Sequence, residues 1–302
     1  VVALAVLQLV GSSLIAGIQK VIVVANIILL SVVAIGLSSL GEPGRLAVST
    51  WPETTPILGS LALTFFAFTG FAVIGNSVQQ MAHPARDLRR AMFGTMLIVI
   101  TLYLALALAT TAAVSHEQLV TSGPILLIEA ARTAFGDLGY KVLLVSAIVA
   151  TVTCINGGLF GATNITYALA EKGNLPSRFE QKALASTRGL TISAAAALVM
   201  LNTMDLTTVA SLGSATTLLV YFMVNVGALR VIRGTRGQRA LILLSVLACG
   251  FALVVWLMYT LKYKPHSLGI FIGFLVLALI IEILMQRVTG RRFESQAQST
   301  QG

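Results

Sequence analysis

Charged residues are what this sequence has least of. Only 10% of its 302 residues are charged, against 57% that are hydrophobic, whereas soluble domains carry about 25% charged residues. The mean hydropathy of +0.91 is correspondingly high. Cysteine is also scarce, and Cys154 and Cys249 both lie inside apolar runs, so neither a disulfide framework nor a zinc site is indicated. These shortages exclude a soluble domain and predict an integral membrane protein.

A second shortage concerns groups that carry out chemistry. The apolar runs contain no paired acids, and the three histidines, His83, His116 and His266, fall in separate polar segments. A membrane-embedded enzyme would need such groups at helical spacing, or a nucleophile beside a base. The net charge of +9 does not indicate nucleic acid as a partner, because the basic residues form short clusters between apolar runs. We therefore expect no enzyme and no nucleic-acid binding, and a lipid bilayer as the surroundings.

Long apolar runs are what the sequence does have. An α-helix needs about 20 residues to cross the core of a bilayer. The chain begins without Met in the apolar residues 1–10, so we expect a fragment that starts near the end of an earlier span. A short interfacial helix is expected at 125–135. Eight complete crossings are predicted, at residues 21–37, 58–78, 91–114, 142–170, 190–204, 206–229, 240–261 and 268–286.

The basic residues predict the orientation of these crossings. With the loop at 83–90 placed in the cytoplasm, alternation of the spans puts fifteen of the twenty Lys and Arg residues on the cytoplasmic side and five on the other. Cytoplasmic loops of membrane proteins are enriched in Lys and Arg. We therefore expect the basic loops and the C-terminus to be cytoplasmic.

The run from Leu58 to Val78 contains a weak point at its middle. Gly70 costs about 1 kcal/mol of helix propensity relative to Ala, and its bulky neighbours between Phe65 and Phe71 do not strengthen the helix. An opened turn in hydrocarbon leaves backbone groups unpaired, so a break survives only where it lines a cavity or meets a ligand. The alternative is that Gly70 lets another helix pack closely. The local pattern leaves both interpretations open.

Several segments resemble amino acid permeases of the amino acid-polyamine-organocation (APC) family. FFAFTGFA, followed by HPARDLRRAM, resembles the sixth membrane helix of that family and the loop after it. GLFGATNITYALAEKGNLPSRF resembles the end of the eighth helix, LTTVASLGSATTLLVYFMVNVGALRVIR the tenth, and GSSLIAGIQKVIVVANIILL the entry to the fifth. The resemblance covers nearly all of the chain and places its start at the end of the fourth helix.

The resemblance implies an all-α fold of the LeuT type, with two inverted repeats of five helices and two further helices. Residues 1–40 would be the end of the first repeat, 57–230 the second repeat, 240–287 the two C-terminal helices and 288–302 a cytoplasmic tail. It also implies a secondary transporter of the plasma membrane that moves amino acids or related amines by alternating access. The alternative is a sensor or assembly partner that binds without transporting.

The resemblance also implies where substrate binds. In the family, substrate lies between the broken first and sixth helices, and backbone carbonyls of the sixth face its ammonium group. Carried over to this sequence, Phe66 is the aromatic residue that covers the pocket. The full set of implied substrate residues is Phe66, Ala67, Phe68, Thr69, Gly70, Gly157 and Gly158.

This sequence departs from the family pattern at titratable positions. The usual glutamate after Gly-Phe is Ala72, the usual acidic pair is Gln79 and Gln80, and the loop asparagine is His83. A lysine that some proton-coupled members carry in the fifth helix corresponds to Asn26. A buried lysine can release a proton near neutral pH, and an amide cannot.

Neutral polar groups remain at mid-membrane positions. Asn26, Thr153 and Asn156 form a candidate cation site, on the hypothesis that the fifth and eighth helices face each other. We therefore expect Na⁺ coupling, or exchange without a coupling ion, rather than proton symport, and no other cofactor or metal. The alternative is that the two asparagines only hydrogen-bond neighbouring helices, at about 0.6 kcal/mol each.

Overall fold

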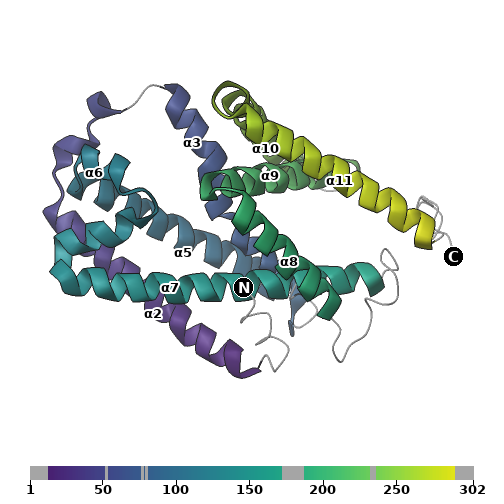
Figure 1. The fold of residues 1–302 in the computed structure, drawn as a ribbon, viewed down its shortest axis with the longest axis horizontal. Helices are drawn as coiled ribbons and strands as arrows, with labels where there is room; N and C mark the ends of the chain where they lie inside the picture. Colours follow the sequence, from purple (N-terminus) through teal and green to yellow (C-terminus); the bar gives the residue numbers. More distant parts are fainter. Residues whose placement is uncertain are drawn as a thin grey trace. The chain divides into compact units, whose positions relative to one another are not determined.

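The described part of the chain is helical throughout. The computed structural model describes residues 13–51, 54–75, 78, 81–171, 187–231 and 236–289 (Figure 1), and every regular element in these ranges is a helix. The prediction of an all-α membrane protein is therefore confirmed. The predictions for residues 1–10, for Gln79 and Gln80, for the loop at 172–186 and for most of the tail lie outside the described residues.

Six of the described helices are long and apolar enough to cross a membrane. They correspond to six of the eight predicted crossings. The other two predicted crossings contain shorter apolar helices, α3 (Thr54–Ala67) and α8 (Thr187–Thr203). The long helices are α2 (Ser13–Leu40), α5 (Pro84–Ala113), α7 (Leu126–Glu171), α9 (Leu206–Val231), α10 (Arg236–Tyr263) and α11 (Pro265–Thr289).

A sharp turn divides α7 near its start. Gly136 has φ 65° and ψ −158° there, a conformation that is open almost only to glycine. Residues 126–135 are thus separated from the long span, as the predicted interfacial helix requires. Arg132 bridges the turn, because its Nε donates to Asp137 Oδ1 at 3.1 Å and its guanidinium lies 4.5 Å from the ring centre of Tyr140.

The chain divides into two compact units. The first unit comprises Val1–Ile57 and Gly70–Gly161, and the second comprises Leu58–Thr69 and Ala162–Gly302. The predicted division into repeats follows chain order, whereas these units follow contacts between residues. The boundaries of the repeats therefore stay a prediction.

The core of the first unit joins α2, α5 and the start of α7. The ring of Phe135 lies against Gly36, where an added Cβ would come within 2.3 Å of it. This absence of a side chain lets the start of α7 approach α2 closely. The buried residues of this core are Val33, Ala34, Leu37, Leu106, Ala109, Val114, Ala130, Ala131 and Leu143.

The C-terminal ends of α2 and α5 meet. The backbone N–H of Glu42 donates to the carbonyl of Ala112 at 3.0 Å. A Cβ on Gly41 would lie only 2.8 Å from the Cβ of Ala112. Because both helices are long enough to span a membrane, this contact means that they run in the same direction.

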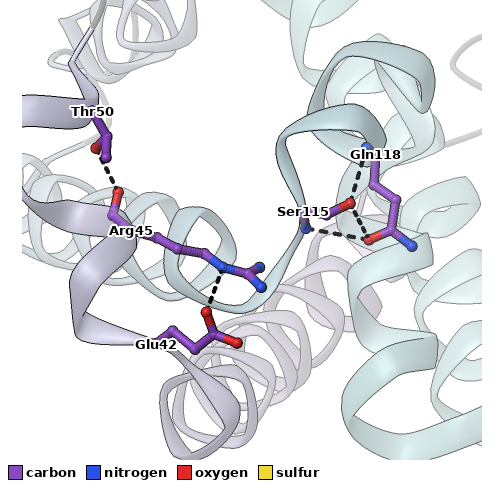
Figure 2. A network of polar contacts seen from close by, with 5 residues as sticks. All are labelled: Glu42, Arg45, Thr50, Ser115 and Gln118. Atoms are coloured by element: carbon purple, nitrogen blue, oxygen red, sulfur yellow. Dashed lines mark hydrogen bonds and ion pairs between the residues drawn. The ribbon is translucent and has the colours of Figure 1, made fainter.

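Polar contacts order the segments that leave these two helix ends (Figure 2). After α2 come two 3-10 turns, η1 (Pro43–Leu46) and η2 (Val48–Thr50), and after α5 comes α6 (His116–Thr121). Figure 2 shows an ion pair of 3.1 Å from Arg45 to Glu42, a hydrogen bond from the Thr50 hydroxyl to the Arg45 carbonyl, and the capping box of Ser115 and Gln118 that starts α6.

The parallel course of α2 and α5 implies one crossing between them. That crossing runs through α3, the 3-10 turn η3 (Thr69–Phe71) and α4 (Ala72–Gly75). α3 alone rises about 21 Å, which is less than a bilayer core of about 30 Å, and η3 and α4 continue the segment after it. α3 is therefore short because the crossing is interrupted.

In the second unit α9, α10 and α11 pack side by side (Figure 1). Trp256 of α10 lies in their shared core. Its Nε1 donates to the hydroxyl of Ser211 on α9 at 2.8 Å, and its ring meets that of Phe271 on α11 edge-on, with centres 4.9 Å apart. These contacts fix the buried face of α9, because a buried indole N–H requires a partner.

Candidate functional site

The predicted weak point at Gly70 coincides with an interruption of the helix. α3 ends at Ala67, Phe68 forms a turn, and the 3-10 turn η3 begins at Thr69. The chain returns to α-helical geometry only at Ala72. The break, which was one of the two interpretations that the sequence left open, is therefore present.

Hydrogen bonds change their pattern at this break. The N–H of Phe68 donates to the carbonyl of Phe65 at 3.0 Å, three residues back instead of four. The hydroxyl of Thr69 donates to the carbonyl of Phe66 at 2.8 Å. A carbonyl has two lone pairs, so Phe66 keeps capacity for a further donor. An interruption of this kind can present backbone dipoles to a ligand inside a membrane.

Aromatic rings of the second unit hold α3 up to the break. The ring of Tyr259 on α10 lies against Gly59, where a Cβ would be 2.3 Å from it. The rings of Phe65 and Tyr221 meet edge-on, with centres 6.3 Å apart. Phe66 is 40% exposed, and the Cδ2 and Cε2 atoms of its ring lie against Gly213. The last turn before the interruption is therefore fixed in place.

The remaining predicted substrate residues, Gly70, Gly157 and Gly158, belong to the first unit. A Cβ built on any of these glycines meets no atom of its own unit within 4 Å. Close packing of another helix, the alternative for Gly70, thus finds no support within that unit. Their role in substrate binding stays a prediction, as does that of Phe66 to Thr69.

The structure does not bring the three residues of the candidate cation site together. The hydroxyl of Ser146 donates to the amide oxygen of Asn26 at 2.6 Å, whereas the amide of Asn156 donates to Gln19 at 3.5 Å. Thr153 donates to the carbonyl of Val149 in its own helix.

The separation follows from the antiparallel pairing of α2 and α7. Ser146 and Asn156 are ten residues apart on α7, and a helix rises about 15 Å over that length. One cation cannot bind side-chain oxygens so far apart. The hypothesis that Asn26 and Asn156 face each other is therefore corrected by the geometry, and the observed pairs agree with the alternative that these amides join neighbouring helices.

Three contacts were absent from the sequence interpretation. Gln19 and Ser146 complete the polar pairs between α2 and α7, and Gly213 receives the ring of Phe66. Gln19 is a polar residue next to an apolar run, which is a usable signal. Serine and glycine are common in membrane helices, so Ser146 and Gly213 carry no comparable signal.

The predicted basic loop at 83–90 is mostly the exposed start of α5, which begins at Pro84. His83 precedes the helix, and its backbone N–H donates to the Asp87 carboxylate at 3.1 Å. The neighbouring Arg86, Arg89 and Arg90 are exposed to solvent. These residues thus form a solvated helix start, which agrees with a role in setting the orientation of the membrane spans.

Comparison with known proteins gives the family. The inner membrane transport protein YbaT of Escherichia coli is 28% identical over 262 residues, which are 86% of this chain and 60% of that protein. An uncharacterized protein of Methanocaldococcus jannaschii is 28% identical over 240 residues, 78% of this chain and 54% of its own length. The serine/threonine exchanger SteT of Bacillus subtilis is 32% identical over 117 residues, 39% of this chain and 27% of the exchanger.

The first two alignments show that the chain spans somewhat more than half the length of these relatives. The names of YbaT and SteT are those of transporters, which agrees with the expectation of a protein that is not an enzyme. The family described as Amino acid permease matches residues 1–292. With apolar spans and an interrupted crossing helix in that range, the chain belongs to the amino acid permease family.

Proposed function

We propose that this protein is a secondary transporter that moves amino acids or related amines across the plasma membrane by alternating access. The observation that carries the proposal is the interruption at Ala67 to Phe71, inside a segment that has to cross the membrane. Backbone groups are left outside the regular helix there, and hydrocarbon tolerates such groups only where they meet a cavity or a ligand. Membership of the amino acid permease family supports an amino acid as that ligand.

In the proposed binding mode the ammonium group of the substrate donates to carbonyls of the interrupted turn. The candidates are Phe66, Ala67, Phe68, Thr69 and Gly70, with Gly157 and Gly158 as further lining. Carbonyl dipoles in a region of low dielectric constant interact strongly with a cation. The ring of Phe66 would cover the substrate and exclude water. The fold proposed around this turn is of the LeuT type.

For coupling, we propose exchange that needs no proton. The polar pairs between α2 and α7, Asn26 with Ser146 and Asn156 with Gln19, contain only neutral groups. The proposal covers both Na⁺-coupled transport and exchange without a coupling ion. The separation of Asn26 from Asn156 favours the second of these. Imposing sodium and pH gradients separately on proteoliposomes tests this. Uptake driven by a proton gradient without Na⁺ would contradict it.

The test of the proposed function is uptake by the full-length protein in proteoliposomes. The twenty radiolabelled L-amino acids are offered one at a time, with serine and threonine first because one relative is a serine/threonine exchanger. We expect saturable accumulation of at least one, accelerated by unlabelled amino acid inside. Binding in detergent without accumulation in vesicles would favour the sensor instead.

A further inference from the structure

The ring of Phe66 occupies the space where any other residue than glycine at 213 would place its side chain. A Cβ on Gly213 would lie 2.3 Å from Cε2, 2.5 Å from Cδ2 and 3.4 Å from Cζ of that ring. Carbon atoms do not approach each other more closely than about 3.5 Å without repulsion. A single added methyl group therefore requires the ring, α3 or α9 to move.

α3 cannot move away easily. Its start is held by the ring of Tyr259, which fills the space above Gly59. Near its end, Phe65 meets the ring of Tyr221 edge-on. Both contacts lie in the second unit, and both would have to open before the helix could retreat from α9.

α9 is equally constrained beside Gly213. Its neighbours Leu212 and Ser214 are buried, with 4% and 0% of their surface exposed, and Ala215 is fully buried. Ser211 accepts the hydrogen bond from Trp256 at 2.8 Å. Well-packed interiors resist shifts of even one methylene group. The ring of Phe66, 40% exposed, is the part that is free to turn.

We propose that Gly213 is a positioning residue for Phe66, and that its missing side chain fixes where this ring stands beside the interrupted turn. The consequence for transport rests on the proposed function, in which Phe66 covers the substrate. A methyl group at 213 would push the ring of Phe66 away from α9. The carbonyl of Phe66 accepts the hydrogen bond of the Thr69 hydroxyl in the interrupted turn. The substrate would then meet a Phe66 ring that has been displaced from its place over the site.

The experiment compares four forms of the full-length protein: wild type, Gly213→Ala, Phe66→Ala and the double variant. Two controls complete it. Gly59→Ala introduces an equally close contact, 2.3 Å from Tyr259, at the far end of α3. Gly227→Ala adds a methyl group on α9 where no atom lies within 4 Å. The melting temperature is measured in detergent, and KM and Vmax are measured for whichever of the twenty L-amino acids the wild type transports best.

We expect Gly213→Ala to lower the melting temperature and to raise KM about tenfold, with a smaller change in Vmax. Adding Gly213→Ala to Phe66→Ala should change the melting temperature and KM no more than Gly227→Ala does, because the ring that the methyl group would displace is gone. Gly59→Ala should lower the melting temperature and leave KM as it is. If Gly213→Ala does not fold alone, recovery of folded protein in the double variant supports the contact.

An equal loss of melting temperature from Gly213→Ala with and without the Phe66 ring would overturn the proposal. An equal rise of KM in Gly59→Ala would also overturn it, since the effect would then belong to the packing of α3 in general. A Phe66→Ala variant with unchanged KM, or no uptake of any amino acid, counts against the proposed function instead. The melting temperatures then still decide whether Gly213 positions the ring.

Discussion

The hydroxyl of Ser146 on α7 donates a hydrogen bond of 2.6 Å to the amide oxygen of Asn26 on α2. The two residues lie 120 positions apart in the chain, and their bond joins two membrane-spanning helices of the first unit. A second polar pair, Asn156 with Gln19, lies further along the same two helices. Together they fix the register of α2 against α7 by neutral groups alone.

The first prediction concerns the strength of this bond. A double-mutant cycle with Asn26→Leu and Ser146→Ala should give a coupling of about 0.6 kcal/mol in the free energy of unfolding, the average for polar pairs between membrane helices. Thr151→Val is the matched control, because the Thr151 hydroxyl bonds to Ala147 in its own helix. If the coupling is no larger than that between Asn26→Leu and Thr151→Val, the bond between Ser146 and Asn26 contributes nothing to stability.

The second prediction concerns the interruption. Gly70→Leu should reduce uptake strongly, because a large side chain would fill the proposed pocket and favour a closed helix. Its protein level should stay normal, since no atom of its own unit lies within 4 Å of the new Cβ. Gly94→Leu on α5, where the added Cβ is equally unobstructed, serves as control. Unchanged uptake by a well-expressed Gly70→Leu protein would refute the site.

The third prediction concerns orientation. In a protein without its native cysteines, a cysteine at Ser49 should react in intact cells with a reagent that cannot cross the membrane. A cysteine at Ala85 should react only after permeabilisation. Both positions are exposed in the structure, so accessibility does not limit either reaction. The opposite pattern would place the loop at 83–90 outside the cell, against the distribution of basic residues.

The fourth prediction concerns pH. Hydrogen bonds from the side chain and backbone of Thr208 lower the pKa of Asp205, which caps α9 at its start, and the charge of Lys264 adds to this effect. A lowered pKa means stability that is fully present above the unfolded pKa of about 3.9 and is lost as pH falls through the folded pKa.

Asp205→Ala should therefore lower the melting temperature at pH 7, and the difference from wild type should shrink as the pH falls below about 4. Asn202→Ala, one turn earlier, is the control, because the Asn202 amide donates to the carbonyl of Leu198 in its own helix, α8. A difference that stays constant down to pH 3 would show that the charge of Asp205 contributes nothing.

The sequence predicted the features that depend on local composition. The apolar runs predicted the spanning helices. Gly70 with its bulky neighbours marked the weak point, with close packing as the alternative, where the structure has its interruption at Ala67 to Phe71. Both follow from a property of each segment taken alone, its length and its helix propensity.

The sequence could not predict which residues of two different helices lie opposite each other. Asn26 and Asn156 are each plausible cation ligands by type, but pairing α2 with α7 places Ser146, not Asn156, opposite Asn26. In the same way nothing near Gly213 in the chain indicates that the ring of Phe66 lies on it. Such contacts join residues more than a hundred positions apart, and a local pattern contains no information about them.

The turn at Gly136 has a consequence for the match between protein and lipid. As one straight rod, the 46 residues of α7 would measure about 69 Å, well beyond the 40–45 Å of a whole bilayer with its headgroups. The glycine conformation redirects the first ten residues, so the straight part of the helix is shortened to about 53 Å. A residue with a side chain at 136 would favour the straight rod, and the excess length would have to be absorbed by tilting or by local thickening of the bilayer. This one backbone conformation therefore shortens the straight length that the lipid has to match by about 15 Å.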